Sequence, residues 1–546
     1  MRRALLTSAI SALWILGATA APAQDAPPAK ATYDKWCAGC HGADGKGEGF
    51  AAATMLPRPR DFTTALYQIR TTPSGALPTD EDIRRIIDVG MPGTAMPGWA
   101  KHLGEQERMA LVAYLKAFSP RFESQDSPEP VEIGSAPGES EEALAEGRQI
   151  YEKIECWKCH GRAGRGGGPS APTLEDDQGF PIAAADLTES WNFNGGATTD
   201  EIFTRLMTGL NGTPMPSFAD LIDAEVVTEE QLWRVAQYVR SLSPEEPEAK
   251  EVIRAGLTEG ALPERVDDPA WAGVERFYVP LVGQVIEAPR WFTPSVDGVW
   301  VQALHDGEDL ALLVTWHDPS ESPTPKWNEW EAKVLAAVLP EGSSEEGAQA
   351  DTSAVPDTTG ASNPAGAVAR GPVGGLHDAL MVQFPTTIPD GMERPYFLMG
   401  SEEKPVYLWR WESGPAGARE ALARGLTAFE PLPGEGVLSA QAVYSEGAWQ
   451  LLIRRSLKAE GAEGRLQLEP GKAIPMALFA WDGSNGESGS QGSISTWYFL
   501  HLDQPAAATL YAVPILAMLL TAGLGVVVVS RARRRESDHA RDAGSS

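Results

Sequence analysis

All four cysteines of this 546-residue chain fall in two short motifs of one form, at residues 37–42 and 156–161. In each motif two cysteines are separated by two residues and are followed by histidine and glycine. No cysteine remains for a disulfide. A zinc ribbon would need both cysteine pairs to converge on one ion, yet each pair has its own histidine in its own stretch of the chain. The spacing therefore favours covalent attachment of two haem groups over zinc or redox-dithiol chemistry.

In a motif of this kind the two thiols add to the vinyl groups of the haem, and the adjacent histidine binds the iron. The motifs therefore constrain two stretches of the chain to hold one haem each. The sequence predicts two haem c groups, with the thioether cysteines and iron-binding histidines Cys37, Cys40 and His41 in the first site and Cys156, Cys159 and His160 in the second.

The two motifs belong to an internal repeat with a constant offset of 119 residues, the separation of Cys37 and Cys156. The chain thus contains two copies of one unit, at 30–120 and 143–244. The same offset relates further residues, namely Thr79 to Thr198, Gly90 to Gly209, Gly93-Thr94 to Gly212-Thr213 and Met96-Pro97 to Met215-Pro216.

A methionine followed by proline lies 55 residues after each motif histidine, at Met96 and Met215. Methionine sulfur is a common second axial ligand of c-type iron. Met91 is a second candidate near the first site, but the repeat aligns it with Leu210. We therefore predict Met96 on the iron of the first haem c and Met215 on the iron of the second.

Each copy resembles a class I cytochrome c domain in its C-x-x-C-H motif, its Met-Pro loop and the helical stretch that closes it. The resemblance implies two all-α domains, each around one haem, with histidine and methionine on a closed, six-coordinate iron suited to electron transfer. A diheme peroxidase would need an iron that opens. A self-contained diheme redox enzyme stays an alternative interpretation.

Acidic stretches separate these copies from each other and from the rest of the chain. Residues 121–142 form a predicted linker, and another acidic connector runs from 244 to 264. Over 265–503, short apolar and aromatic runs alternate with Gly, Pro and Asp turns, which predicts a β-sandwich domain. Residues 340–372 are rich in Ser, Gly, Ala and Glu without periodicity, which predicts a flexible surface insertion.

Three segments of this third region, within 378–385, 396–411 and 479–498, resemble the haem b-binding γ subunit of ethylbenzene dehydrogenase and its relatives. These relatives are periplasmic molybdenum enzymes. The resemblance implies a non-covalent haem b held by methionine and lysine, and it assigns the methionine to Met399. The expected lysine is absent from residues 486–493.

Three explanations of the missing lysine remain open. Another residue, namely Lys472, His305 or His501, supplies the second ligand, or the haem is five-coordinate, or the domain has lost its haem. The last explanation corresponds to an alternative function, in which a diheme cytochrome c is fused to a haem-free ligand- or carbohydrate-binding sandwich.

Both ends of the chain carry signals for export and anchoring. Residues 1–23 show the charged, apolar and small-residue order of a signal peptide. Residues 506–530 carry no charge and are long enough to cross a membrane, and four arginines follow within 531–535, at the start of the predicted tail 531–546. Because positive residues stay cytoplasmic, we expect a single-pass anchor with a cytoplasmic tail and a body on the periplasmic side of a bacterial inner membrane.

A formal net charge of −30 argues against nucleic acid as a partner and favours a basic partner protein. The sequence shows no nucleophile with a base, no carboxylate pair and no spare metal cluster, so we identify no catalytic residue. We therefore expect a subunit that relays electrons between a molybdenum and iron–sulfur oxidoreductase and the respiratory chain, through haem b and two c haems. A soluble cytochrome or a membrane oxidase or reductase would be the partner at the other end.

Overall fold

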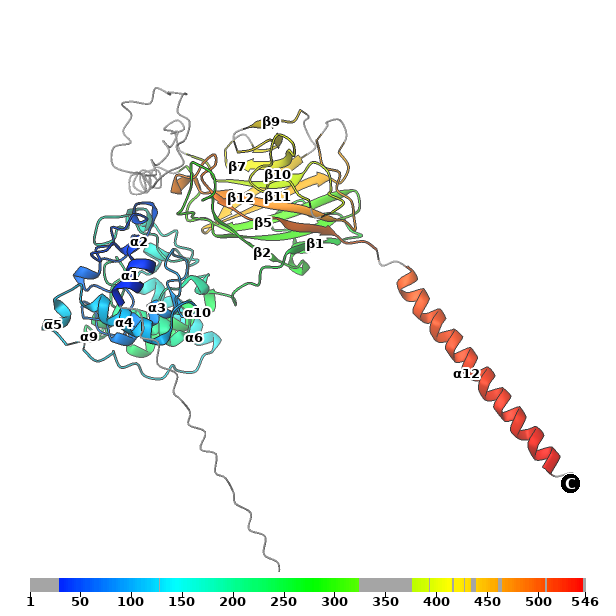
Figure 1. Ribbon diagram of the computed structural model, residues 1–546, viewed down its shortest axis with the longest axis horizontal. Helices are drawn as coiled ribbons and strands as arrows, with labels where there is room; N and C mark the ends of the chain where they lie inside the picture. The colour runs from blue at the N-terminus through cyan, green and yellow to red at the C-terminus, as the bar shows by residue number, and fades with distance from the viewer. Residues whose placement is uncertain are drawn as a thin grey trace, which may run out of the picture.

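The computed structural model describes residues 29–126, 128–323, 376–391, 393–414, 417–426, 428–433, 438–459, 464–505 and 508–543. The predicted signal peptide at 1–23 and the predicted insertion at 340–372 lie outside the described residues. Figure 1 shows three parts in chain order, namely helices in the N-terminal half, a large sheet, and one long helix near the C-terminus.

The first helical domain consists of helices that pack around a common core. α1 and α3 both contact α4, and their buried residues join one hydrophobic cluster. α3 begins at a capping box, in which Thr79 and Asp82 each accept a hydrogen bond from the backbone N–H of the other. The helices are α1 (Ala29–Trp36), α2 (Ala38–His41), α3 (Asp80–Val89), α4 (Glu105–Lys116) and α5 (Arg121–Ser124).

The second helical domain repeats this arrangement with α6 (Glu141–Lys153), α7 (Trp157–His160), α8 (Thr199–Thr208), α9 (Ala219–Asp223) and α10 (Glu229–Leu242). α10 packs against both α6 and α8. The rings of Phe203 and Trp233 stack with centroids 3.8 Å apart. Where α6 crosses α10, a Cβ on Gly147 would lie 2.1 Å from the Arg234 carbonyl oxygen, so only glycine allows this approach.

The two helical domains contact each other directly. Arg70 is fully buried, and its Nη2 donates to the Thr208 carbonyl oxygen of the second domain at 2.7 Å. Arg85 forms an ion pair with Glu201 at 2.9 Å. Because a buried guanidinium must keep its hydrogen bonds, this contact fixes the position of one domain relative to the other.

The third part is one mixed sheet with the strand order β10-β11-β5-β4-β1-β14-β12-β6-β7-β8-β9. β1 is parallel to both of its neighbours, β4 and β14. The strands are β1 (Val252–Leu257), β2 (Phe277–Pro280), β3 (Val282–Gly283), β4 (Gly298–His305), β5 (Asp309–His317), β6 (Ala379–Pro385), β7 (Val406–Glu412), β8 (Gly417–Ala423), β9 (Phe429–Pro431), β10 (Leu438–Ser445), β11 (Ala448–Ser456), β12 (Ala473–Trp481), β13 (Ser493–Ile494) and β14 (Tyr498–Leu502).

β1 corrects the predicted start of this domain at residue 265. The strand lies within 244–264, where the acidic composition predicts a connector, and yet it occupies the middle of the sheet. Ile253 and Ala255 are fully buried. Only two residues of this short strand are buried, so its alternation of buried and exposed positions is too weak to predict a strand among acidic neighbours. Its pairing partners also lie far along the chain.

The sheet folds over so that its two halves share one core. Trp316 on β5 and Leu451 on β11 belong to the same buried cluster as Val382 on β6 and Trp409 on β7. β10 and β8, which lie near opposite ends of the strand order, also contact each other. The prediction of a β domain is confirmed in the form of one large mixed sheet around a common core.

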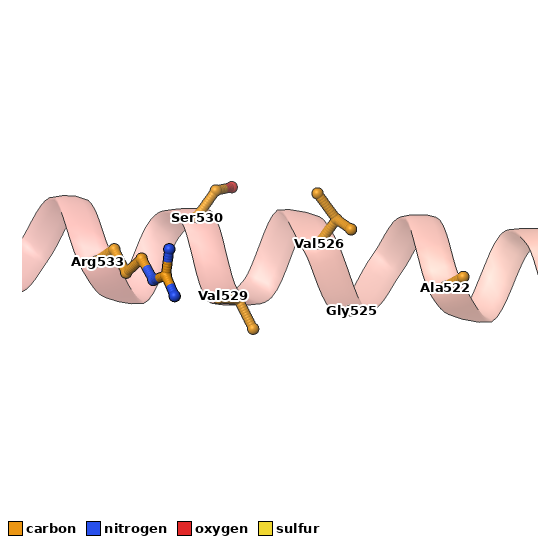
Figure 2. A pocket seen from close by; sticks show the side chains of 6 residues that line it. All are labelled: Ala522, Gly525, Val526, Val529, Ser530 and Arg533. Atoms are coloured by element: carbon orange, nitrogen blue, oxygen red, sulfur yellow. The ribbon is translucent and has the colours of Figure 1, made fainter.

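α12 (Ala508–Ala543) contains one stretch, Ala512–Ser537, that is long and apolar enough to cross a membrane, by length and composition. None of this stretch is buried against the rest of the protein. A shallow pocket runs along it, and Figure 2 shows that its lining side chains, including Val526 and Arg533, all come from this one helix. The pocket is therefore no enclosed site. The membrane segment at 506–530 and the tail at 531–546 stay predictions.

Candidate haem sites and a buried methionine

Each motif histidine is oriented by a backbone carbonyl. Nδ1 of His41 lies 3.1 Å from the Arg60 oxygen, and Nδ1 of His160 lies 2.9 Å from the Ala185 oxygen. A carbonyl oxygen only accepts, so Nδ1 carries the proton and Nε2 keeps its lone pair. Burial lowers the pKa of both histidines and favours the neutral ring. Both side chains are thus in the state in which Nε2 binds iron.

The first cysteine and the histidine of each motif are joined by one helical turn. The backbone N–H of His41 donates to the Cys37 oxygen at 2.9 Å, and that of His160 donates to the Cys156 oxygen at 3.0 Å. Burial raises the pKa of the Cys37 thiol to about 11 and that of Cys156 to about 12. A redox dithiol needs a lowered thiol pKa, so these surroundings oppose the dithiol interpretation.

A tyrosine locks the turn after each motif, and the sequence repeat does not reveal it. The hydroxyl of Tyr33 donates to the Gly42 oxygen, and that of Tyr151 donates to the Gly161 oxygen, both at 2.7 Å. The second copy has one extra residue between tyrosine and motif, so the constant offset fails here. Glu155 absorbs this residue in a left-handed conformation, with a φ of 65°.

The two predicted methionine ligands lie in loops with the same hydrogen bonds. The N–H of Met96 donates to Thr94 Oγ1 and that of Met215 donates to Thr213 Oγ1, both at 3.2 Å. Each threonine hydroxyl in turn donates to a carbonyl three residues earlier. The two loops therefore fix the backbone of Met96 and of Met215 with the same pair of hydrogen bonds.

Met91, the competing methionine, occupies the place of Leu210 in this loop. Its N–H donates to the Met96 oxygen at 3.0 Å, as the N–H of Leu210 donates to the Met215 oxygen at 3.1 Å. Met215 and Cys156 both pack against the hydrophobic cluster of the second domain. Met96 is partly buried in the matching loop of the first domain.

In the sheet domain, Met399 is 1% exposed and has a left-handed backbone, with a φ of 59°. This conformation is costly for a residue with a Cβ. The amide of Gln383 holds it, because Oε1 accepts from the Met399 N–H and Nε2 donates to the Phe397 oxygen, both at 3.0 Å. Backbone strain of this kind clusters at functional sites.

The three segments that carry the resemblance to γ subunits converge on Met399. One buried cluster contains Met381 from the first segment, Met399 from the second and Phe479 from the third, with Trp497 packed against it. These residues are brought together by the pairing of β6 with β12 and β7. The methionine thus lies in a buried cluster to which all three segments contribute.

None of the three candidates for a second haem b ligand lies near Met399. Lys472 directly precedes β12, and His501 pairs with the first residue of that strand. His305 is at the same end of the sheet, with Nε2 2.9 Å from the Asp503 oxygen. The cluster around Met399 contains the last residues of β12, about 20 Å away at about 3.3 Å per residue. The donors of the described residues therefore do not fit a haem held by methionine and one of these side chains.

The second helical domain is joined to the sheet through His317, the last residue of β5. Its Nδ1 lies 2.7 Å from an Asp186 oxygen and 3.1 Å from a Glu189 oxygen. Burial lowers the pKa of His317, but its bonds to the two carboxylates outweigh burial and raise the pKa to about 9. A charged imidazolium therefore links the domains at neutral pH.

Two groups of side chains in the described part of the chain have a spacing that could suit metal ligands, which the sequence pattern does not anticipate. In each group, three potential ligand atoms lie within 4.8 Å of one another. The sequence gives no spacing that reveals them, because their members come from separate strands and domains. The groups are Asp186, Glu189 and His317, and Asp318, Asp378 and Asp482.

Residues 24–115 match the family described as cytochrome C oxidase, cbb3-type, subunit III, and residues 144–243 match the family described as cytochrome c. The chain contains two cytochrome c domains in tandem. The two helical domains are therefore cytochrome domain 1 and cytochrome domain 2, and each is of the kind that carries haem c.

Two curated relatives match this chain over 124 residues each. A Haloferax mediterranei protein named respiratory nitrate reductase heme subunit is 31% identical over 22% of this chain and 42% of its own. The chlorate reductase subunit gamma of Ideonella dechloratans is 28% identical over 22% of this chain and 49% of its own. The matches thus span less than half of each relative. With the family matches, they support a cytochrome fused to a domain of the molybdoenzyme γ-subunit type, as the sequence predicts.

A solved structure is also similar to part of this chain. It is a chain of the Kuenenia stuttgartiensis reducing HAO-like protein complex, with 46% identity and a TM-score of 0.38. The match covers 40% of this chain and 96% of that chain.

Proposed function

We propose that this cytochrome is an electron-transfer subunit that relays electrons between a separate catalytic protein and the respiratory chain through two c haems. The observation that carries the proposal is the pair of matched sites, each with a histidine Nε2 free for iron and a methionine in a loop of the same design. An iron held by histidine and methionine changes oxidation state without binding a substrate.

The ligands that we propose follow from these sites. His41 and Met96 hold the first iron, and His160 and Met215 hold the second. The motif cysteines fix the haem rings covalently, and the carbonyls of Arg60 and Ala185 keep the histidine rings in position. With two protein ligands each, the irons would have no position left for a substrate, which would suit transfer of electrons and oppose catalysis at either iron.

The contact between the cytochrome domains supports passage of electrons from one haem to the other. Arg70 of the first domain bonds to the Thr208 oxygen, and Thr208 immediately precedes the loop that holds Met215. The buried guanidinium thus ties domain 1 to the haem loop of domain 2. A fixed separation of the two haems is what a relay requires, because electron transfer depends on distance.

For the catalytic protein we propose a molybdenum and iron–sulfur oxidoreductase. The relatives named as subunits of nitrate and chlorate reductases support this class. We interpret the folded-over sheet as a γ-subunit sandwich that docks this partner. α12 would anchor the chain in the inner membrane, with the cytochrome and sheet domains on the periplasmic side. A soluble cytochrome or a membrane oxidase or reductase would exchange electrons with the c haems.

For a haem b in the sheet domain, Met399 is the residue that we propose as a ligand. Its burial, its strained backbone and the convergence of three segments support this role. Because the other expected donors lie at the far end of β12, the proposed relay uses the two c haems alone.

The test uses the full-length protein, purified in detergent from a host that attaches c haems. Pyridine haemochrome spectra should show two covalent haems per chain, and one non-covalent haem in addition if Met399 holds a haem b. Absence of non-covalent haem would remove the role of Met399 and leave the c-haem relay intact. High-spin iron that binds carbon monoxide at either c haem would overturn the relay and favour a diheme enzyme.

A further inference from the structure

Three aspartates from three strand ends meet inside the sheet domain. Asp318 follows β5, Asp378 precedes β6, and Asp482 follows β12. Their exposed fractions are 0%, 0% and 1%, and one carboxylate oxygen of each lies within 4.8 Å of the others. The three residues are called the aspartate triad here. The triad lies where the two halves of the folded sheet meet, since β5 belongs to one half and β6 to the other.

The hydrogen bonds to the triad come from neutral groups. Asp378 accepts from the Ser322 N–H at 2.7 Å, from Trp449 Nε1 at 3.1 Å and from the Gly483 N–H at 3.0 Å. Asp482 accepts from the N–H and hydroxyl of Ser484 at 2.7 and 2.6 Å. These donors orient the carboxylates but bring no positive charge to balance them.

Buried oxygens without a hydrogen-bond partner lie on the same segment. One oxygen of Asp318 accepts from the Ser320 N–H at 3.1 Å, but the other, Oδ2, is buried without a partner among the described residues. The hydroxyls of Ser320 and Ser322 are likewise buried and without a partner there. Since a buried polar atom without a partner costs about 1–3 kcal/mol, a ligand that binds these oxygens would stabilise the domain.

Three carboxylates cannot all stay charged in this position without a cation or a proton. Burial makes the charged form of each carboxylate costly, and three charges with oxygens this close together repel one another. A divalent cation would remove this repulsion. Oxygens in contact with one Ca²⁺ ion, at about 2.3–2.6 Å from it, lie up to about 5 Å apart, which agrees with the spacing of the triad.

We propose that the aspartate triad is a structural calcium site, with carboxylate oxygens of Asp318, Asp378 and Asp482 as the ligands. An all-oxygen donor set selects hard cations, and Ca²⁺ accepts irregular geometry and serine or carbonyl oxygens as further ligands. The bound cation joins the ends of β5, β6 and β12. It also fixes Asp318, whose neighbour His317 contacts cytochrome domain 2.

The first test measures the wild-type protein and needs no variant. Full-length protein in detergent is stripped with EGTA and then dialysed against Ca²⁺, and bound metals are measured by mass spectrometry. We expect one Ca²⁺ per chain and a rise of the sheet-domain Tm by about 5 °C on adding Ca²⁺. Equal Tm values with and without Ca²⁺, and no bound Ca²⁺, would overturn the proposal. Stoichiometric Mg²⁺ in its place would overturn the assignment to calcium.

The second test locates the ion. Asp318→Asn keeps the size of the side chain and an oxygen for the Ser320 N–H, but removes one charge, so we expect Ca²⁺ affinity to fall about 100-fold. Asp267→Asn, at an exposed carboxylate of the same domain, is the matched control and should bind Ca²⁺ like the wild type. Loss of Ca²⁺ binding in Glu189→Gln but not in Asp318→Asn would place the ion in the other acidic group and contradict the proposal.

Discussion

Nδ1 of His317 lies 2.7 Å from a carboxylate oxygen of Asp186, and this contact joins the end of a sheet strand to the second haem site. Asp186 directly follows Ala185, whose carbonyl oxygen accepts the hydrogen bond that orients His160. A single salt bridge therefore connects the sheet domain to the residue beside a haem ligand. Loss of this salt bridge should therefore weaken the interface between the sheet domain and cytochrome domain 2.

The stability of this interface should depend on pH. The pKa of His317 is raised from 6.5 to about 9, so its contribution is complete below pH 6.5 and is lost as the pH rises through about 9. Asp297 acts in the same direction at lower pH, because burial and repulsion by Glu189 raise its pKa to about 7. We expect limited proteolysis in the connector at 245–251 to become faster between pH 6.5 and 9.

The variant His317→Asn should lose this dependence on pH and destabilise the interface by up to about 3 kcal/mol at pH 6. His102→Asn, at an exposed histidine of cytochrome domain 1, is the control and should retain the wild-type profile. An unchanged profile in His317→Asn would show that other groups govern the interface.

Replacement of the proposed methionine ligands should change one haem at a time. Leucine at Met96 or Met215 has nearly the same volume but no sulfur, so we expect the reduction potential of the affected haem to fall by on the order of 0.1 V and its iron to bind carbon monoxide. Met91→Leu is the matched control, because Met91 occupies the place of Leu210. If Met91→Leu shifted the potential and Met96→Leu did not, the assignment at the first haem would be reversed.

The variant Met399→Leu tests whether Met399 is a haem ligand or only a methionine of the hydrophobic core. A volume-conserving change in the core costs less than about 1.5 kcal/mol, so the domain should stay folded while any non-covalent haem is lost. Met381→Leu, in the same buried cluster, should keep that haem. Retention of the non-covalent haem in Met399→Leu would exclude the sulfur as its ligand, and haemochrome spectra of both variants decide the point.

Gly147→Ala should destabilise cytochrome domain 2 by about 1–3 kcal/mol, because the new Cβ would lie 2.1 Å from the Arg234 carbonyl oxygen and force α6 away from α10. Thermal unfolding followed at a haem band should show the effect. Gly138→Ala adds a methyl group where no atom lies within 4 Å and should leave this transition unchanged. Equal Tm values for both variants would mean that the helices can separate at little cost.

Much of the candidate site could be predicted from the sequence because the relevant information is local. The C-x-x-C-H motifs and the Met-Pro loops each act within a few residues, and the repeat favours Met96 over Met91 as the predicted ligand. The tyrosines that lock the motif turns could not be predicted from the repeat, since one extra residue before Cys156 breaks the constant offset. The strand β1 was not predicted for a different reason. Its place in the sheet depends on pairing with β4 and β14, which lie further along the chain.

By itself, the sequence determined that this protein carries two matched haem c motifs in helical domains, since covalent attachment and axial ligation are encoded at fixed short spacings. Only the tertiary structure decided which distant side chains meet. Strand pairing and the folding over of the sheet bring Asp318, Asp378 and Asp482 to one buried point and place Lys472 far from Met399. The physical reason is that contacts across strands depend on register and on the path of the whole sheet, and neither leaves a local pattern in the sequence.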